Sequence, residues 1–266
     1  MTVSIGKAWE ETSAFLGREA RLVAPVALAT FALPAILADW AFPKGASGAA
    51  AWLMLVVLAA VLIGQMTVVL LVNDWRGSIG EAMGKAARRL PVLLAGMIIV
   101  FFPAILIATV AVGVSLVGAG ITDPASVTPQ ALAKLPGFLW ALLLLSLLFI
   151  VLAVRMFPIS AVAASEPVGP IGLIKRSWSM TRGNFWRLFA LVLLLGIAAL
   201  VLDGAVTMVV GSIATLAAGE PKAFNTSALM VALVSGLIGA LVSTVSAAMV
   251  GRVYAQVAGE PGTATP

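Results

Sequence analysis

Six long apolar runs occupy most of the chain, and shorter polar segments separate them. Each run has about twenty residues or more, enough for a helix to cross a hydrocarbon core of about 30 Å at about 1.5 Å per residue. The pattern predicts an all-α, polytopic membrane protein with six transmembrane helices in one domain, residues 1–258, and a short disordered tail, residues 259–266. The predicted spans cover residues 22–42, 49–72, 91–117, 137–164, 185–211 and 228–250.

Three further segments combine apolar and charged positions with helical spacing. In the third of them Ile171, Ile174 and Trp178 recur every three or four residues and form an apolar face. A basic amphipathic helix with a Trp on that face is typical of a helix lying in the plane of a membrane surface. We therefore predict cytoplasmic amphipathic interfacial helices, with a frayed tail as the alternative for the first. They cover residues 4–18, 78–90 and 170–182.

The three amphipathic segments begin with similar tripeptides. Ser4-Ile5-Gly6 and Ser78-Ile79-Gly80 are identical, and Pro170-Ile171-Gly172 matches them at two of three positions. Each tripeptide precedes two predicted spans, so the pattern favours a threefold internal repeat of one surface helix and two spans. The alternative, that any three membrane hairpins with interfacial linkers look alike, stays open.

The composition supports the membrane class and narrows the chemistry. Hydrophobic residues make up 62% of the chain and charged residues 10%, where soluble domains have about a quarter charged residues. The chain has no Cys and no His, which removes thiolate chemistry, the commonest general base and the commonest transition-metal ligand. It also has no G-x-S-x-G motif, and no paired carboxylates share a predicted pocket. We therefore expect no enzyme and no cofactor.

The positive charge is unevenly distributed. Of the 16 Lys and Arg residues, Lys44, Lys134 and Lys222 fall in the loops on one side of the predicted membrane, and the other 13 fall on the opposite side. This bias predicts that both termini lie in the cytoplasm. Because the bases are spread over several short segments, they favour anionic lipid headgroups as partners and not nucleic acid. The surface bases are Lys85, Arg88, Arg89, Lys175, Arg176, Arg182 and Arg187.

Four polar residues inside the predicted spans form the candidate intramembrane site. Asp203 is the acid deepest in a span, about 24 Å along the helix from Arg187 at about 1.5 Å per residue. A carboxylate within a membrane is a functional hypothesis by default, although Asp203 reaching surface water is an equal alternative. Thr207 continues its helical face, and Gln65 adds polarity to the second span.

Arg155 is the fourth polar candidate, inside the end of the fourth predicted span. We expect its long side chain to reach the cytoplasmic interface. The alternative is an ion pair with a carboxylate such as Asp74 or Glu166.

The sixth predicted span has a small residue at every fourth position. Small residues let helix backbones approach closely in a membrane. We expect this helix to be central in the bundle, with a dimer seam as the alternative. The small residues are Ser235, Gly239, Ser243, Ala247 and Gly251.

A run of residues around the third amphipathic segment carries a family signature: Arg155, Pro158, Glu166, Gly169-Pro170, Lys175-Arg176-Ser177-Trp178, Thr181-Arg182-Gly183-Asn184 and Phe185-Trp186. This run resembles the multi-span membrane domain that is fused to some bacterial glycerophosphoryl diester phosphodiesterases and also occurs alone, so we expect a multi-pass protein of the bacterial inner membrane. The resemblance implies a helical integral membrane domain. The soluble phosphodiesterase half of those proteins works through histidines and metal-binding carboxylates, so no catalytic residue carries over to a chain without His.

Two functions are compatible with these patterns. The first is transport or handling of a small hydrophobic or amphiphilic, lipid-like molecule, which Asp203 and the basic surface segments favour. The second is a membrane scaffold or accessory subunit without transport, which the small-residue helix and the missing polar pathway favour. A partner membrane protein or a homo-oligomer is compatible with either.

Overall fold

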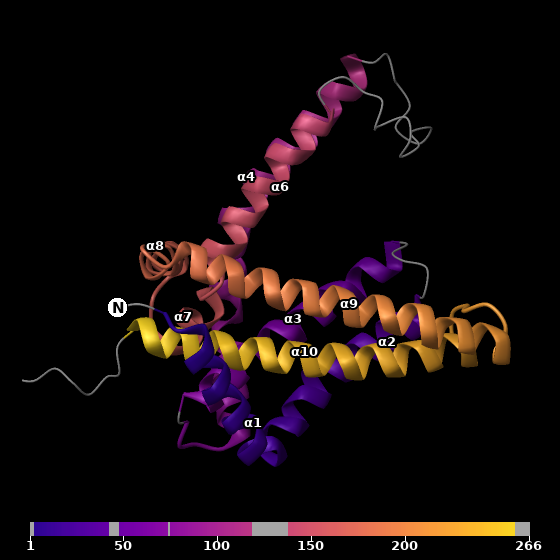
Figure 1. Cartoon of the computed structure of the whole chain (residues 1–266), viewed down its shortest axis with the longest axis horizontal. Helices are drawn as coiled ribbons and strands as arrows, with labels where there is room; N and C mark the ends of the chain where they lie inside the picture. The colour runs from indigo at the N-terminus through magenta and orange to yellow at the C-terminus, as the bar shows by residue number, and fades with distance from the viewer. Residues whose placement is uncertain (1–2, 43–47, 74, 119–137, 259–266) are drawn as a thin grey trace, which may run out of the picture.

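The computed structural model describes residues 3–42, 48–73, 75–118 and 138–258. These residues form helices and connecting loops, with no strand among them. Within the described ranges six helical segments are long and apolar enough to cross a membrane, which confirms the predicted all-α polytopic fold (Figure 1). The predicted tail at 259–266, and Lys44, Asp74 and Lys134, lie outside the described residues.

The described residues form α-helices and one π-helix. In chain order they are α1 (Ile5–Ala27), the π-helix η1 (Leu28–Ala32), α2 (Leu33–Ala41), α3 (Gly48–Val72), α4 (Ile79–Gly118), α6 (Phe138–Met156), α7 (Ile159–Ser165), α8 (Pro170–Met180), α9 (Phe185–Ala218) and α10 (Thr226–Ala258).

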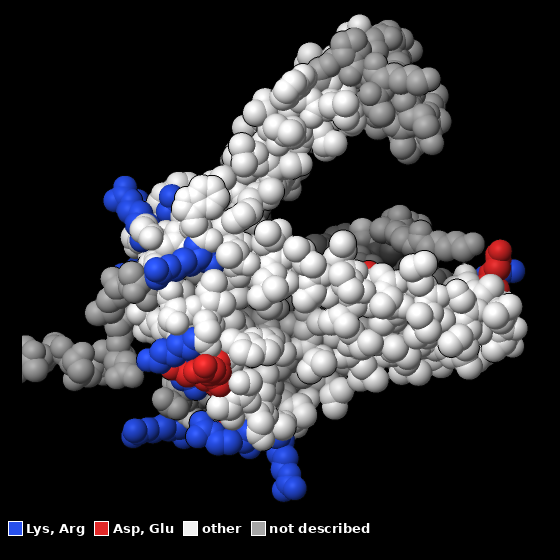
Figure 2. Space-filling model, in the orientation of Figure 1, with Lys and Arg blue, Asp and Glu red and all other residues white. Residues whose placement is uncertain are grey.

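Lys and Arg side chains gather at one end of the molecule (Figure 2). At this basic end α8 packs on α4 and α7, and α7 packs on α3 and α10. The main hydrophobic core lies here: the last turns of α3, from Met66 to Val72, and residues 159–164 of the short helix α7 are buried. We call the part of the molecule away from the basic end the distal half. It consists of all of α2 (residues 33–41), residues 199–218 of α9 and residues 226–243 of α10.

The seven Trp residues mark the two levels at which the spans begin and end. Indole rings concentrate at membrane–water interfaces because they are amphipathic. The distal set lies near the ends of α2, α3 and α6 that point away from the basic end, and comprises Trp40, Trp52 and Trp140. The basic-end set comprises Trp9, Trp75, Trp178 and Trp186.

The helix α10 is central, since it contacts α9 on one side and α1, η1, α2, α3 and α7 on others. Its close contacts use a different row of small residues from the predicted one. A Cβ added to Gly236 would collide with the Ile36 side chain, whereas one added to Gly239 has no heavy atom within 4 Å. The buried row is Ala228, Ala232, Gly236, Ala240, Thr244 and Ala248.

The predicted packing row is therefore wrong over its first half. Ser235, Gly239 and Ser243 line cavities between α9 and α10 instead of packing against a helix. Ala247 and Gly251 are buried, and Gly251 packs on α3 beside Val69 and Val72. The two rows differ by one position, so spacing alone does not choose between them, and the neighbouring helices decide which row is covered.

Several predicted boundaries shift in the structure. Residues 78–90 and 91–117 form the single helix α4, which continues through Pro91 and Pro103, so the prediction of a separate interfacial helix at 78–90 is wrong. At 40 residues α4 is about 60 Å long, twice the hydrocarbon thickness. Its start is fixed by a capping box: Ser78 N–H donates to Glu81 Oε2 at 2.9 Å, and Glu81 N–H donates to Ser78 Oγ at 3.2 Å.

The other spans also differ from their predicted limits. The predicted surface helix and first span join in α1, where Glu19 has non-helical angles (φ −106°, ψ 19°) and marks a kink between them. The fourth span breaks at Pro158 into α6 and α7. The predicted loop at 212–227 is shorter, because α9 continues to Ala218 and ends at Gly219, whose φ of 80° favours glycine.

The shared tripeptides of the predicted repeat have a local explanation at two of the three sites. Ser4 caps α1 by accepting a hydrogen bond from Lys7 N–H at 3.3 Å, and Ser78 caps α4 in the same way. At α8 the N-cap is Gly169, followed by Pro170 at the first helical position. Helix capping therefore accounts for the serine that the first two copies share.

The helices α4 and α6 pack together as a hairpin that leads away from α9 and α10 (Figures 1 and 2). The hairpin joins the rest of the bundle near the basic end, through contacts of α4 with α7 and α8 and of α6 with α8 and α9. The bundle is thus closely packed at the basic end and opens toward the distal half.

Candidate functional site

A cavity with polar walls lies in the distal half, between α2, α9 and α10. Its volume is about 740 Å³. Asp39 of α2 and Asp203 of α9 both line it, with Thr207 and Ser235 on the α9 and α10 walls. The remaining lining residues are Gly211, Ser212, Thr215, Leu216, Pro221, Ala228, Val231 and Ala232.

The last turn of α2 carries Asp39 to this cavity, and the α9–α10 loop holds that turn in place. Trp40 Nε1 donates to the Asn225 carbonyl oxygen at 3.2 Å, and Phe224 N–H donates to the Trp40 carbonyl oxygen at 3.0 Å. The rings of Trp40 and Phe224 also meet edge to face, with centroids 5.4 Å apart. These contacts fix the position of Asp39 relative to α9 and α10.

The two carboxylates have few partners within the protein. The Ser235 hydroxyl lies 3.5 Å from Asp39 Oδ2 and 3.4 Å from the Ala232 carbonyl oxygen, so it donates no short hydrogen bond to either. Among the described residues no Lys or Arg forms an ion pair with Asp39 or Asp203, and both side chains are exposed in the cavity. A carboxylate at this depth needs water or a ligand to compensate its charge.

Two more cavities adjoin this one along the α9–α10 seam. A cavity of about 250 Å³ shares Asp203 and Ser235 with it and is otherwise lined mainly by apolar residues. A third, of about 580 Å³, shares Leu202 and Val242 with the second and reaches Trp9 at the start of α1. The seam therefore changes from polar in the distal half to apolar toward the basic end.

The structure brings together only part of the predicted intramembrane site. Asp203 and Thr207 line the same cavity, whereas Gln65 lines none of the cavities found in the described residues. The expectation that no two carboxylates share a pocket is wrong, because Asp39 faces the same cavity as Asp203. Asp39 was missed because it lies near the end of its span, where an acid is usually hydrated. The sequence feature that could have identified Asp39 is its position inside an apolar run.

Arg155 lies at the basic end, far from this cavity in the fold. Its Nη1 donates to Thr181 Oγ1 at 3.1 Å, and its guanidinium lies over the rings of Trp178 (4.9 Å) and Phe185 (5.4 Å). It therefore lies at the basic end and does not pair with Glu166, so Glu166 is wrong as its alternative partner, and its reach to the cytoplasmic interface stays a prediction. Aromatic faces replace a carboxylate as its counter-group, and the alternative partner Asp74 lies outside the described residues.

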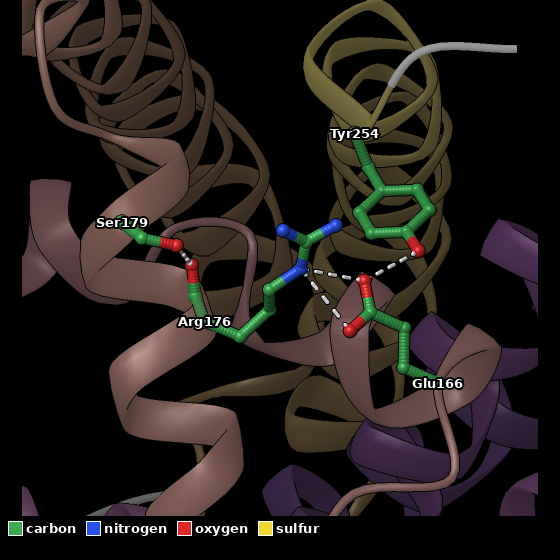
Figure 3. A network of polar contacts seen from close by, with 4 residues as sticks. All are labelled: Glu166, Arg176, Ser179 and Tyr254. Carbon is green, nitrogen blue, oxygen red and sulfur yellow. Dashed lines mark hydrogen bonds and ion pairs between the residues drawn. The ribbon is translucent and has the colours of Figure 1, made fainter. Parts of the chain in front are cut away.

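Glu166 instead pairs with Arg176 (Figure 3). Arg176 Nε donates to both carboxylate oxygens, at 2.9 and 3.1 Å, and the Tyr254 hydroxyl donates to Oε1 at 3.0 Å. The α7–α8 connection is thereby joined to the last turns of α10. Arg176 is thus a structural residue in part, not only a surface charge.

The N-terminal residues are held by side chains from three distant positions, an arrangement we call the N-terminal clasp (Val3, Ser4, Asn184, Arg187 and Gln256). Val3 N–H donates to the buried Asn184 Oδ1 at 3.1 Å, and Arg187 Nη1 donates to the Val3 carbonyl oxygen at 3.0 Å. Gln256 completes it by accepting from Ser4 N–H at 3.0 Å and donating to the Ser4 carbonyl oxygen at 3.3 Å. Asn184, the last residue of the Thr181-Arg182-Gly183-Asn184 stretch, therefore serves the packing of the basic end.

The predicted apolar face of α8 points away from the bundle. Leu173, Ser177 and Met180 are buried against the bundle, whereas Ile171 and Trp178 of the predicted apolar face are 62% and 39% exposed. Lys175 is exposed beside them. A mixed apolar and basic face of this kind is what a membrane interface accommodates.

The comparisons with known proteins name no activity. No curated protein and no solved structure matches the chain. The resemblance to the membrane domain of glycerophosphoryl diester phosphodiesterases therefore stays a prediction. One family model, described as a domain of unknown function (DUF7847), matches residues 4–257, and the chain belongs to this family.

Proposed function

We propose that the protein binds a small amphiphilic, lipid-like molecule within the bacterial inner membrane and transports it or hands it on. The observation that carries the proposal is the cavity of about 740 Å³ that two carboxylates from different helices share. A membrane protein that needed only to pack would leave neither Asp39 nor Asp203 in this position without a basic partner.

The lining of the cavity supports one kind of ligand. Among its described lining residues the charged ones are Asp39 and Asp203, and hydroxyl groups of Thr207, Ser212 and Ser235 add hydrogen-bonding capacity. The adjoining seam is apolar. We infer a molecule with a cationic or hydrogen-bond-donating head and an apolar body. The proposal includes no catalysis, since the chain has neither His nor Cys.

The charge distribution supports the orientation. Thirteen of the 16 Lys and Arg residues belong to the segments that we place in the cytoplasm, and the positive-inside rule then puts both termini there. In this orientation the basic end faces the cytoplasm and the two-carboxylate cavity lies in the outer half of the bilayer.

Binding of a fluorescent lipophilic cation to the protein in lipid nanodiscs tests the proposal. Replacing Asp39 or Asp203 with Asn removes one charge and keeps the side-chain shape, and we expect each variant to bind at least about tenfold more weakly. Glu220→Gln is the matched control, because Glu220 carries a charge at the same end but does not line the cavity.

Transport is measured separately, as uptake of the same dye into proteoliposomes by the wild type and the Asp203→Asn variant. Binding without uptake would indicate handling and not transport. Equal binding by wild type, Asp39→Asn and Asp203→Asn, together with no small molecule that co-purifies with the wild type alone, would overturn the proposal. That result would favour the scaffold or accessory subunit.

A further inference from the structure

A nearly apolar groove follows the α9–α10 seam on the side of the basic end. It has a volume of about 580 Å³. Leu191 and Leu195 of α9 and Val242 of α10 form its walls, and Ile5 and Trp9 of α1 lie against it. In a bilayer such a groove faces lipid, so acyl chains are the apolar material available to fill it.

A basic residue begins the α9 wall of this groove. Arg187 precedes Leu191 and Leu195 by one and two turns on the same helical face. Its side chain is exposed, and among the described residues its one hydrogen bond runs from Nη1 to the Val3 carbonyl oxygen. A guanidinium has five N–H donors, so most of them remain for another acceptor.

Two exposed indoles mark the depth of Arg187. Trp186 is 76% exposed beside it, and Trp9, 54% exposed, lies at the α1 edge of the groove. Exposed Trp rings concentrate at the headgroup level of a membrane. Arg187 therefore lies at the depth of lipid phosphates, and the groove begins where acyl chains begin.

The length of the groove also matches one leaflet. From Leu191 to Leu202 the α9 wall rises by about 16 Å, and half of a 30 Å hydrocarbon core is about 15 Å. At Leu202 the seam meets the smaller cavity that contains Asp203. A chain lying in the groove thus spans its own leaflet and ends where the polar cavity starts.

We propose that this groove is a binding site for an anionic phospholipid of the leaflet at the basic end, with its phosphate on Arg187 and one acyl chain along α9 and α10. The site is separate from the two-carboxylate cavity and has the opposite charge preference. Arg187 also holds Val3, so a bound lipid contacts the N-terminal clasp and stabilises the start of α1.

Two acidic residues of α1, Glu10 and Glu11, are relevant to how strongly Arg187 binds a lipid phosphate. Glu11 pairs with Lys7 at 3.7 Å, and Glu10 lies one turn beyond Gly6, which lines the groove. Glu10 therefore opposes the binding of an anion at Arg187. Its replacement by Gln strengthens binding if the phosphate lies where we propose.

Native mass spectrometry of the purified protein, titrated with dioleoyl-phosphatidylglycerol or with dioleoyl-phosphatidylcholine, tests the site. We expect Arg187→Gln to weaken phosphatidylglycerol binding about tenfold, the loss of one charge-assisted hydrogen bond. Arg182→Gln, a change of the same charge on the exposed α8–α9 corner, is the control and should alter binding by less than about twofold.

Because Arg187→Gln also removes a contact of the clasp, a second variant leaves the clasp intact. Ala198→Trp fills the groove and should reduce the binding of both lipids, and Ala190→Trp, on the same helix but outside the groove lining, should not. A phosphatidylglycerol with a photoreactive acyl chain should label residues 191–202 of α9 in the wild type and lose that labelling in Ala198→Trp.

Three results would overturn the lipid site: equal losses in Arg187→Gln and Arg182→Gln, no change in Ala198→Trp, or labelling spread evenly over the lipid-facing helices. None of them depends on the lipophilic cation, so failure of this site and failure of the proposed function are separate outcomes.

Discussion

The basic end and the distal half treat polar side chains in opposite ways. At the basic end Asn184, Glu166 and Arg155 are bound by other protein groups. In the distal half Asp39 and Asp203 face a cavity, and the nearest hydroxyl to Asp39 is 3.5 Å away. Polar groups that are satisfied within the protein stabilise the fold, whereas those left open to a cavity are available to a ligand.

Packing follows the same division. The last turns of α3 and residues 159–164 of α7 are buried at the basic end, and α8 packs on α7. In the distal half α9 is exposed over most of its surface. The comparison teaches that the region around α8, which has the most distinctive sequence, mainly stabilises the fold. The two acids of the distal half, Asp39 and Asp203, form the candidate binding site.

The largest expected effect breaks the packing of α10 within the distal half. Gly236→Leu would place a side chain against Ile36 and the backbone of Ala32, and we expect it to lower the free energy of unfolding by about 1–3 kcal/mol through overpacking. Unfolding in mixed micelles measures the effect. Gly239→Leu is the control, because no heavy atom lies within 4 Å of its added Cβ. An equal loss in both variants would show that the row containing Gly236 is not the packed one.

The second effect tests the N-terminal clasp. Asn184→Leu leaves the Val3 N–H without its acceptor in a buried position, and we expect a loss of about 1–3 kcal/mol in the free energy of unfolding. Hydrogen exchange should show residues 3–8 becoming less protected. Gln256→Ala, which removes the exposed partner of Ser4, should have the smaller effect. A larger loss in the free energy of unfolding for Gln256→Ala than for Asn184→Leu would contradict this prediction.

A smaller effect is expected in the network of Figure 3. Tyr254→Phe keeps the ring and removes the hydroxyl that donates to Glu166 at 3.0 Å, so we expect a loss of about 0.5–1.5 kcal/mol in the free energy of unfolding. The same variant in a Glu166→Gln background should show a reduced loss, because the carboxylate acceptor is gone. If Tyr254→Phe lowered the free energy of unfolding equally with and without Glu166→Gln, the Tyr254 hydroxyl would stabilise the protein through a partner other than Glu166.

The smallest effect on stability is expected at the candidate site itself. Asp203→Asn should leave the unfolding temperature in detergent unchanged or raise it slightly, since it removes a membrane-embedded charge that no described basic group compensates. The same variant is expected to lose binding of the lipophilic cation. A large loss of stability in Asp203→Asn would place this carboxylate with the structural polar groups of the basic end and remove the contrast between the halves.

Some of the candidate site was visible in the sequence and some was not. Asp203 stands out because a carboxylate in an apolar run is rare, and Thr207 one turn later shares its face. Asp39 and Ser235 are 196 positions apart, so only folding shows that they meet. For Arg155, sequence showed a charge near a helix end but not the two aromatic rings that accept it.

Composition and period by themselves determined the number of membrane-crossing helices, because the cost of exposing polar backbone in lipid leaves long apolar helices as the solution for such a chain. They also determined that Lys and Arg gather at one end. Tertiary structure decided which of two small-residue rows on α10 is buried, which face of α8 is covered, and that Asp39 joins Asp203. Adjacent rows on a helix differ by a rotation of about 100°, and that rotation is set by the shapes of neighbouring helices, which local sequence does not contain.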